Sequence, residues 1–308
     1  MAKDDTPAAA GRLCRYALNG AAIEAAQADG GLYLVATPIG NLGDISLRAL
    51  ELLAGADVIA CEDTRVTRKL TERYGIATPL TPYHEHNATV ARPKLLARLA
   101  AGQAVALVSD AGTPLISDPG YRLVRAACEA GHPVTALPGA SATLAALSVA
   151  GLPTDRFFFE GFLPPKQAGR QKRIAELAAI PATLVLFESG PRLAAALADL
   201  ANGLGPRPAA ICRELTKLHE EIRRASLDEL ARDYAEGAET RGEIVIVVAP
   251  PLNDVHDVHD VDDLLRQALA RVSVKDAVGE VALATGRPRR EVYQRALELA
   301  KESGDGPA

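Results

Sequence analysis

The chain lacks several features by which common classes of protein are recognised. Its 308 residues include only four cysteines, and no two of them form a CxxC pair; we interpret them as reduced core residues of a cytosolic protein. No apolar run approaches the roughly 18 residues of a transmembrane helix, and the Ala-rich start has no continuous signal-peptide core. We therefore expect a soluble, cytoplasmic protein without a membrane partner. The four cysteines are Cys14, Cys61, Cys128 and Cys212.

The chain also lacks a basic excess and the common nucleotide-binding fingerprints. Its formal net charge is −5, so any nucleic-acid surface must be a local patch. Neither GxGxxG nor GxxxxGK[ST] occurs, which removes the usual support for binding of NAD or a nucleoside triphosphate. A hydrophobic fraction of 48% with 24% charged residues is ordinary for a globular protein, and the length suffices for two domains.

Short apolar segments alternate with helical patterns through most of the chain, which predicts an α/β fold with a mostly parallel first sheet. We expect strands at 32–36, 58–61, 104–108, 134–137, 183–187, 209–212 and 244–248. The expected parts are a mobile extension with at most a short helix (1–30), an N-terminal α/β domain (31–150), a C-terminal α/β domain (151–250), an acidic linker (251–263) and a helical hairpin (264–303).

Two of these parts permit a second interpretation. The linker alternates His and Asp, which would suit a metal site, but nothing there predicts a structure that makes the side chains converge, so we assign no metal. In the hairpin, Ser273 and Asp276 form a capping-box-like pair, and Arg287, Arg289 and Arg290 gather at a Gly-Pro break. This hairpin could pack on the body or a partner subunit, or it could contact RNA.

The segment 108–120 is the most informative part of the chain. It follows a buried strand and combines two Gly, two Pro, two Asp and two Ser in one loop. Gly112 permits close approach of a ligand, while Pro114 and Pro119 lower the entropy lost on ordering. Such a loop at a strand's carboxyl end favours a small-molecule site. The alternative is a plain strand-to-helix connection, capped by Ser117 or Asp118.

Several short motifs lie between about Leu32 and Val248 and near the C-terminus. They are Leu34–Asp44, Cys61–Arg65, Tyr83–Asn87, Val108–Gly120, Pro138–Ala142, Glu160–Pro164, Arg213–Lys217 with Glu220, Lys275–Ala277 and Glu291–Tyr293. Together these motifs resemble the tetrapyrrole-methylase superfamily and, within it, the 16S ribosomal RNA cytidine 2′-O-methyltransferases. One motif departs from the family, because Gly190–Pro191 replaces the usual Pro-His between Ser189 and Arg192.

The resemblance implies a class III methyltransferase fold that binds S-adenosylmethionine in the cleft between two α/β domains. It also implies a homodimer and, as target, a cytidine in the decoding region of 16S rRNA in the small ribosomal subunit. The implied donor-binding residues are Pro38, Gly40, Asn41, Ser109, Asp110, Ala111, Gly112, Pro114, Leu115, Ile116, Ser141, Ala142 and Gly242.

Methyl transfer to a ribose hydroxyl gains from a base that accepts the hydroxyl proton. The candidates are Glu62, Asp110 and His84, with Asp63 and Glu85 beside them. Each also has a structural interpretation: Glu62 could pair with a nearby arginine, His84 could be a hydrogen-bonded core residue, and Asp110 could cap its own loop.

The motifs also contain or adjoin basic residues that could contact RNA phosphates, or equally form surface salt bridges. These are Arg48, Arg65, Arg68, Lys69, Arg192, Arg213 and Lys217. The alternative functions are methylation of a tetrapyrrole carbon and a non-catalytic module that binds S-adenosylmethionine or RNA.

Overall fold

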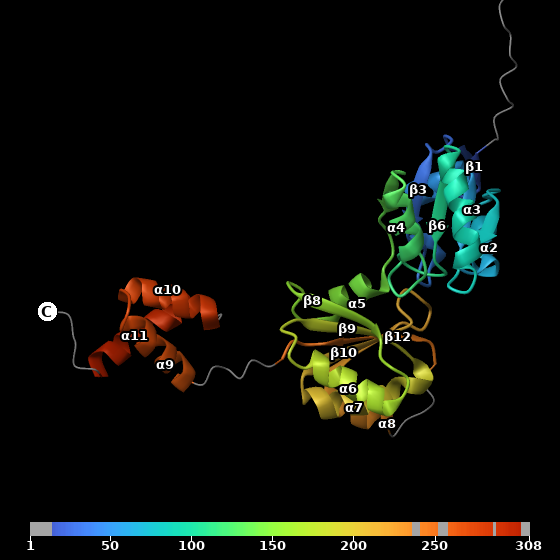
Figure 1. Cartoon of the computed structure of the whole chain (residues 1–308). Helices are drawn as coiled ribbons and strands as arrows, with labels where there is room; N and C mark the ends of the chain where they lie inside the picture. Colours follow the sequence, from blue (N-terminus) through green and yellow to red (C-terminus); the bar gives the residue numbers. More distant parts are fainter. Residues whose placement is uncertain (1–13, 236–240, 252–257, 286–287, 303–308) are drawn as a thin grey trace, which may run out of the picture. The chain divides into compact units, whose positions relative to one another are not determined.

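The computed structural model describes residues 14–235, 241–251, 258–285 and 288–302. These residues form two compact units, one up to Ala249 and one from Pro250 onward (Figure 1). The first unit contains both α/β domains, and the second contains the C-terminal helices. In the described ranges, no helix is long and apolar enough to cross a membrane.

The first domain is built on a parallel sheet with strand order β5-β4-β6-β3-β7. Its strands are β3 (Gly31–Val35), β4 (Val58–Cys61), β5 (Leu80–Pro82), β6 (Ala104–Val108) and β7 (Val134–Leu137). Its helices are η1 (Leu42–Asp44), α1 (Leu47–Gly55), α2 (Thr64–Arg73), α3 (Ala88–Ala100) and α4 (Tyr121–Glu129). The expectation of a mostly parallel first sheet is therefore confirmed.

Both faces of this sheet are buried, which explains why β4 and β6 are continuous apolar runs. Leu50 and Leu53 of α1 pack on one face together with Leu70 of α2. Leu99 of α3 and Leu123 of α4 pack on the other face. The helices thus hold the strands in register, and the strand ends carry the loops that form the site.

Residues 15–24 correct the expectation for the N-terminal segment. They form an antiparallel hairpin of β1 (Arg15–Leu18) and β2 (Ala21–Glu24), whereas we expected a mobile segment with at most a short helix. The turn is Asn19–Gly20, with φ of 50° and 82°, which is the sequence signal of a tight hairpin. Tyr16 is buried in the same core cluster as Leu50 and Leu53 of α1. Residues 1–13 of the expected extension lie outside the described residues.

The second domain has a mixed sheet with strand order β11-β10-β12-β9-β8. Only the β8–β9 pair is parallel, and the other neighbours are antiparallel. The strands are β8 (Phe157–Phe162), β9 (Thr183–Ser189), β10 (Pro208–Arg213), β11 (Glu221–Ser226) and β12 (Glu243–Val248). The helices are α6 (Gln167–Leu177), η2 (Gly190–Arg192), α7 (Leu193–Leu204) and α8 (Leu227–Ala235).

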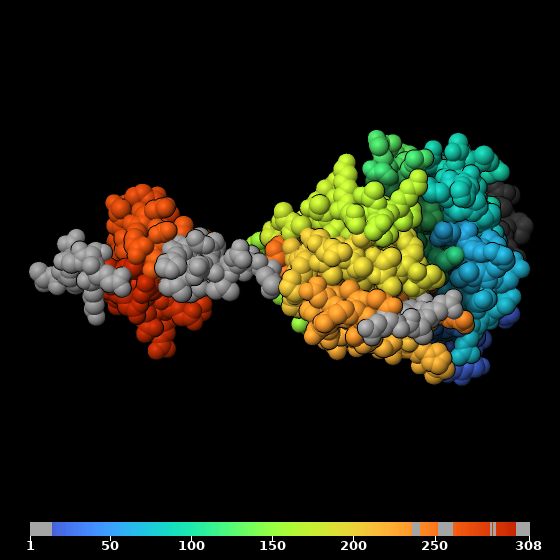
Figure 2. Space-filling view, turned by 90° about the horizontal axis from the view of Figure 1, so that it is seen from below, coloured from blue at the N-terminus to red at the C-terminus, as the bar shows by residue number. Residues whose placement is uncertain are grey.

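Helices α6, α7 and α8 cover one face of this second sheet (Figure 1). Figure 2 shows α7 and α8, in yellow and orange, on the outer surface of the domain. The opposite face packs against α5 (Ala142–Ala150), mainly through Ala146, Leu147 and Ala150. Because α5 follows β7 directly, it joins the first sheet to the second, although we expected 31–150 to be one domain.

The C-terminal unit contains one helix more than the expected hairpin. Its described helices are α9 (Val258–Leu269), α10 (Val274–Thr285) and α11 (Arg289–Glu302), which share one apolar core. The linker expected at 251–263 therefore overlaps α9, while residues 252–257 lie outside the described residues. Ser273 caps α10 as expected, because its Oγ accepts the Asp276 N–H and donates to the Asp276 carboxylate at 2.6 Å. Arg287 also lies outside the described residues.

Candidate active site

The site lies at the carboxyl ends of β3, β6 and β7. Strand β3 lies between β6 and β7, so the loops that follow these strands diverge around a crevice. Two loops are joined by backbone hydrogen bonds, because Thr37 and Gly112 each donate an N–H to the other's carbonyl at 2.9 Å. This topology brings three segments singled out in the sequence to one edge of the sheet.

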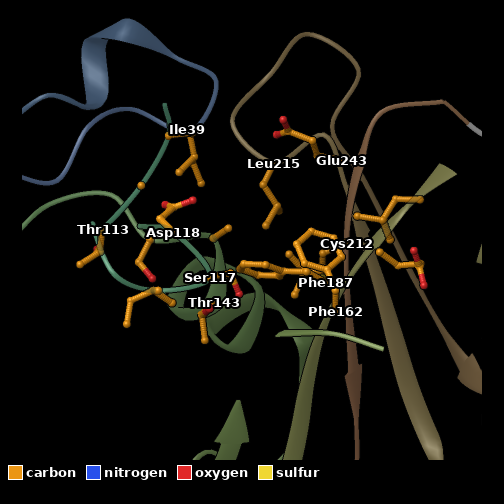
Figure 3. A pocket seen from close by; sticks show the side chains of 18 of the residues that line it. Ile39, Thr113, Ser117, Asp118, Thr143, Phe162, Phe187, Cys212, Leu215 and Glu243 are labelled. Atoms are coloured by element: carbon orange, nitrogen blue, oxygen red, sulfur yellow. The ribbon is translucent and has the colours of Figure 1, made fainter. Parts of the chain in front are cut away.

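A cavity of about 280 Å³ opens between these loops and the second sheet (Figure 3). Ile39, Thr113 and Asp118 lie on one side, and Phe162, Phe187 and Cys212 lie on the other. The complete lining is Ile39, Ala111, Gly112, Thr113, Ile116, Ser117, Asp118, Ser141, Ala142, Thr143, Phe162, Phe187, Glu188, Ser189, Cys212, Leu215, Gly242, Glu243, Ile244 and Val245. Small and apolar residues dominate this list, as is typical of a small-molecule site.

Many of the expected donor-binding residues lie at this cavity or beside it. Those that line it are Ala111, Gly112, Ile116, Ser141, Ala142 and Gly242. Pro38, Gly40, Ser109 and Asp110 line a neighbouring hollow, which shares Ile39, Ala111 and Glu243 with the cavity. Asn41, Pro114 and Leu115 are not among the lining residues of either space. Their role in binding a donor stays a prediction.

The loop after β6 is held in an unusual backbone conformation. Leu115 and Ser117 have φ of 76° and 64°, which side-chain-bearing residues rarely adopt and which tends to occur at functional sites. Ser117 packs on the second domain, where a Cβ at Gly161 would lie only 2.9 Å from its Oγ. Neither Ser117 nor Asp118 caps the following helix, because the N-cap of α4 is Gly120 without a side-chain hydrogen bond. The simple capping interpretation of this loop is therefore wrong.

The second domain contributes the loop of residues 214–217. Lys217 bridges two carboxylates, with its Nζ at 2.8 Å from Glu214 and 3.0 Å from Glu243. Thr216 accepts the N–H of Asn41 on its Oγ1 at 3.1 Å, which ties this loop to the one after β3. Gly40 permits the contact, since a Cβ there would clash with the side chain of Lys217. Two loops from different domains thus approach each other closely at the neighbouring hollow, which both Gly40 and Lys217 line.

Burial, hydrogen bonds and neighbouring charges shift the pKa values of the carboxylates near the site. Hydrogen bonds from Arg65 lower the pKa of Asp63 to about 2. Burial raises the pKa of Asp110, and the nearby Asp63 charge adds to this, against a hydrogen bond from the Asp63 N–H. Burial also raises the pKa of Glu62, as do the charges of Asp110 and Asp118. This edge of the first sheet therefore concentrates negative charge.

The structure brings none of the three expected proton acceptors into the cavity itself. Asp110 lines the neighbouring hollow, whereas Glu62 and His84 line neither space. The Nδ1 atom of His84 is buried without a hydrogen-bond partner among the described residues. The carboxylate that does line the cavity from the first domain is Asp118, which we expected only as a possible helix cap. The signal in the sequence that could have identified Asp118 was its position in the 108–120 loop.

The expected RNA-binding residues do not form one free patch. Arg65 pairs with Asp63, Arg192 with Glu188, and Arg213 with Glu221. These three arginines and Lys217 therefore form salt bridges, which is the alternative to RNA binding that the sequence left open. Arg48, Arg65, Arg68 and Lys69 are exposed on α1 and α2 of the first domain. The substituted motif forms η2, which leads into α7 and keeps Arg192 beside Glu188.

The cysteines differ in exposure, and this gives a chemical prediction. Cys14, Cys61 and Cys212 are buried, but Cys128 is exposed, which corrects the expectation that all four are core residues. Burial raises the pKa of Cys212 to about 11, so little reactive thiolate forms at pH 8. We expect iodoacetamide at pH 8 to label Cys128 within minutes while Cys212 stays unmodified, as read by mass spectrometry of peptides. Equal labelling of native protein at both residues would contradict the buried cavity wall, and urea-unfolded protein is the positive control.

Comparison with known proteins places this site in a family. Residues 31–231 match the model of the tetrapyrrole (corrin/porphyrin) methylases, and residues 255–300 match the RsmI C-terminal HTH domain. Ribosomal RNA small subunit methyltransferase I of Mesorhizobium japonicum is 53% identical over 276 residues, covering 89% of this chain and 94% of that protein. The protein of the same name from Pseudomonas aeruginosa is 45% identical, with 89% and 99% covered.

Solved structures show the same fold at lower identity. Cobalt precorrin-4 methyltransferase CbiF matches with a TM-score of 0.54 at 17% identity, covering 71% of this chain and 94% of that one. Diphthine synthase matches with a TM-score of 0.54 at 20% identity, covering 71% and 89%. The family model spans most of the first unit, and the curated relatives span nearly the whole chain. The chain therefore belongs to the tetrapyrrole (corrin/porphyrin) methylase family and is an S-adenosylmethionine-dependent methyltransferase.

Proposed function

We propose that this enzyme transfers a methyl group from S-adenosylmethionine to the 2′-hydroxyl of a cytidine in the decoding region of 16S rRNA. The observation that carries the proposal is the 53% identity, over 89% of the chain, to a protein named for methylation of small-subunit ribosomal RNA. The substrate would be the small ribosomal subunit, and the reaction would take place in the cytoplasm. The family resemblance also supports a homodimer, which light scattering of the purified protein tests.

The cavity suits S-adenosylmethionine on chemical grounds. The hydroxyl of Thr143 is buried in its wall without a hydrogen-bond partner among the described residues, so a polar ligand would satisfy it. Phe187, Leu215 and Val245 offer an apolar surface for the adenine ring. At the N-terminus of α5, Ser141 and Ala142 line the cavity, where a helix dipole favours the donor's carboxylate.

The bound donor supplies an electrophilic methyl group on a sulfonium sulfur. The residues of the chain need mainly to place the ribose hydroxyl in line with that methyl group and to exclude water. The loops after β3, β6 and β7 form one wall, and the 214–217 loop closes the other. Their backbone is tied together by the Thr37–Gly112 hydrogen bonds and by the Asn41–Thr216 contact. Such a rigid frame favours catalysis through positioning.

A labelling assay tests the proposed function. We expect purified protein to transfer tritiated methyl groups from S-adenosylmethionine to small ribosomal subunits taken from a strain that lacks the corresponding methylase. After nuclease digestion, the label should elute as 2′-O-methylcytidine. Subunits from the methylase-containing strain are the control, because their site is already modified.

The same assay separates the alternatives. A tetrapyrrole precursor is offered in place of the subunits, and we expect it to accept no label. Labelling of the tetrapyrrole, with no 2′-O-methylcytidine in the RNA, would overturn the proposal in favour of the small-molecule reaction. Donor binding without transfer to either substrate would instead favour a non-catalytic binding module.

A further inference from the structure

We propose that Asp118 is a catalytic residue that accepts the proton of the ribose 2′-hydroxyl during methyl transfer. The inference rests on the proposed function, since it requires a hydroxyl as the methyl acceptor. Asp118 lines the cavity on the side of the first domain, near Ile39 and Thr113 (Figure 3). It stands in the loop after β6, whose backbone the fold holds in an unusual conformation.

The other carboxylates that line the cavity are already engaged. Glu243 has a largely exposed side chain, 77% accessible, and pairs with Lys217 at 3.0 Å. Glu188 is buried, its Oε1 accepts the Ser189 N–H at 2.8 Å, and Arg192 lies 3.2 Å from its Oε2. Each of these two carboxylates therefore already has a cationic partner from the second domain. In the described part of the chain, no lysine or arginine pairs with Asp118.

Burial and a charged group near Asp118 raise the pKa of its carboxylate. Burial raises the pKa of Asp118 and the charge of Asp110 adds to this, while a hydrogen bond with the Ser109 side chain opposes it. Glu62 lies near enough for Asp118 to raise its pKa in turn. Arg65 is the positively charged residue of this cluster, and it pairs with Asp63 and not with Asp118. A raised pKa makes the carboxylate of Asp118 a stronger base than an ordinary aspartate, which is the direction that general-base catalysis favours.

The position of Asp118 is fixed by its neighbours in the chain. Ser117, immediately before it, has a φ of 64° and contacts the second domain at Gly161. Gly120, two residues later, is the N-cap of α4 and has a φ of 143°. A side chain larger than glycine at position 120 would collide with Leu115 and Leu107. These contacts fix the backbone on both sides of Asp118, which lines the cavity, as a catalytic group requires.

The proposed step conserves atoms and charge. The 2′-oxygen forms the new bond to the methyl carbon, and the carbon–sulfur bond breaks with its electron pair left on sulfur. The hydroxyl proton passes to a carboxylate oxygen of Asp118. The products are the 2′-O-methyl ribose, S-adenosylhomocysteine and a neutral Asp118, which returns its proton to water before the next turnover.

The central test compares Asp118→Asn with Asp118→Glu, with Asp155→Asn as a matched control at an exposed position outside the cavity. Asparagine keeps the size but cannot accept the proton, so we expect kcat on small ribosomal subunits to fall about 100-fold or more. Glutamate should restore at least a tenth of the wild-type rate. Calorimetry should show that the asparagine variant binds S-adenosylhomocysteine within about threefold of wild type.

Two pH-dependent measurements distinguish proton acceptance from a structural role. In wild type, kcat should fall as the pH drops through the pKa of Asp118, and this limb should be absent from the residual activity of the asparagine variant. The folded state holds the Asp118 proton more tightly than the unfolded state, so wild-type stability decreases as pH rises above the unfolded pKa of about 3.9. At pH 8 the asparagine variant should therefore melt above wild type, not below it.

Each outcome decides one question. An asparagine variant with kcat within threefold of wild type, or one that loses S-adenosylhomocysteine binding together with activity, would overturn the role of Asp118 as proton acceptor. A variant that loses activity and also melts below wild type at pH 8 would indicate a structural role instead. If wild-type protein transfers no methyl group to the cytidine, the proposed function itself fails, which the wild-type arm reveals.

Discussion

Replacing Gly40 by alanine is expected to weaken binding of S-adenosylhomocysteine about 10- to 100-fold, which corresponds to about 1.4–2.8 kcal/mol. The added Cβ would clash with Cγ of Lys217 and lie 2.8 Å from Thr216 Oγ1 and 3.0 Å from the Leu215 carbonyl oxygen. The backbone oxygen cannot move aside as a flexible side chain does. The loops after β3 and β10 must then separate, which opens the wall of the cavity.

Calorimetry of purified variants measures this effect. The Asn41 N–H would lose its hydrogen bond to Thr216, and Lys217 would be displaced from Glu214 and Glu243. Gly169→Ala is the matched control. Gly169 lies inside α6, and an added Cβ there would make only ordinary contacts, of 3.4 Å or more, with Pro164. Affinity within twofold of wild type for Gly40→Ala would show that the two loops need not touch for the donor to bind.

Removing the guanidinium of Arg170 is expected to destabilise the protein by about 3–5 kcal/mol, a typical cost of leaving a buried charge without its partner. Arg170 pairs with Asp199 at 2.6 Å, and both side chains are almost fully buried between α6 and α7. Burial alone would raise the pKa of Asp199. Hydrogen bonds from Gln171 and Arg170 outweigh this effect and hold the pKa below its usual value. Arg170→Ala would remove the charged partner that contributes to that compensation.

Urea unfolding followed by circular dichroism measures the loss. The double variant Arg170→Met with Asp199→Leu is the informative control, since replacing both charges by apolar groups is often close to neutral. The lowered pKa of Asp199 adds stability above the unfolded pKa of about 3.9, and this stability is lost as the pH falls through the folded pKa. A single variant as stable as wild type at pH 7 would show that the pair contributes nothing.

Four of the five strands of the first sheet could be predicted, most clearly β4 and β6, which are buried on both faces, whereas the short, partly exposed β5 was missed. Strands β4, β6 and β7 begin and end where their apolar runs do. Strand β11 was missed, since Glu221–Ser226 is an edge strand that carries two arginines and one glutamate and has no buried residue. Helix α9 was missed because its acidic residues suggested a linker, although Val261 and Leu265 pack in the core of the helical unit.

The candidate site could be predicted only in part. The loops after β3, β6 and β7 were recognised because Gly and Pro are concentrated at strand ends, where ligands bind in open α/β sheets. The second wall was largely missed, since Phe162, Phe187 and Cys212 come from three strands with no shared motif. Only the pairing of β8, β9, β12 and β10 brings them together. The three expected proton acceptors were chosen by chemistry alone, without knowledge of which strand ends face the cavity.

The paired hydrogen bonds between Thr37 and Gly112 have a consequence for how this edge of the sheet opens. Each residue satisfies the other's backbone donor and acceptor, so neither loop can detach without exposing unpaired groups in both. The two loops should consequently open together as one cooperative unit. Substitutions in one loop would then change the energetic effect of substitutions in the other, so their effects should not be additive.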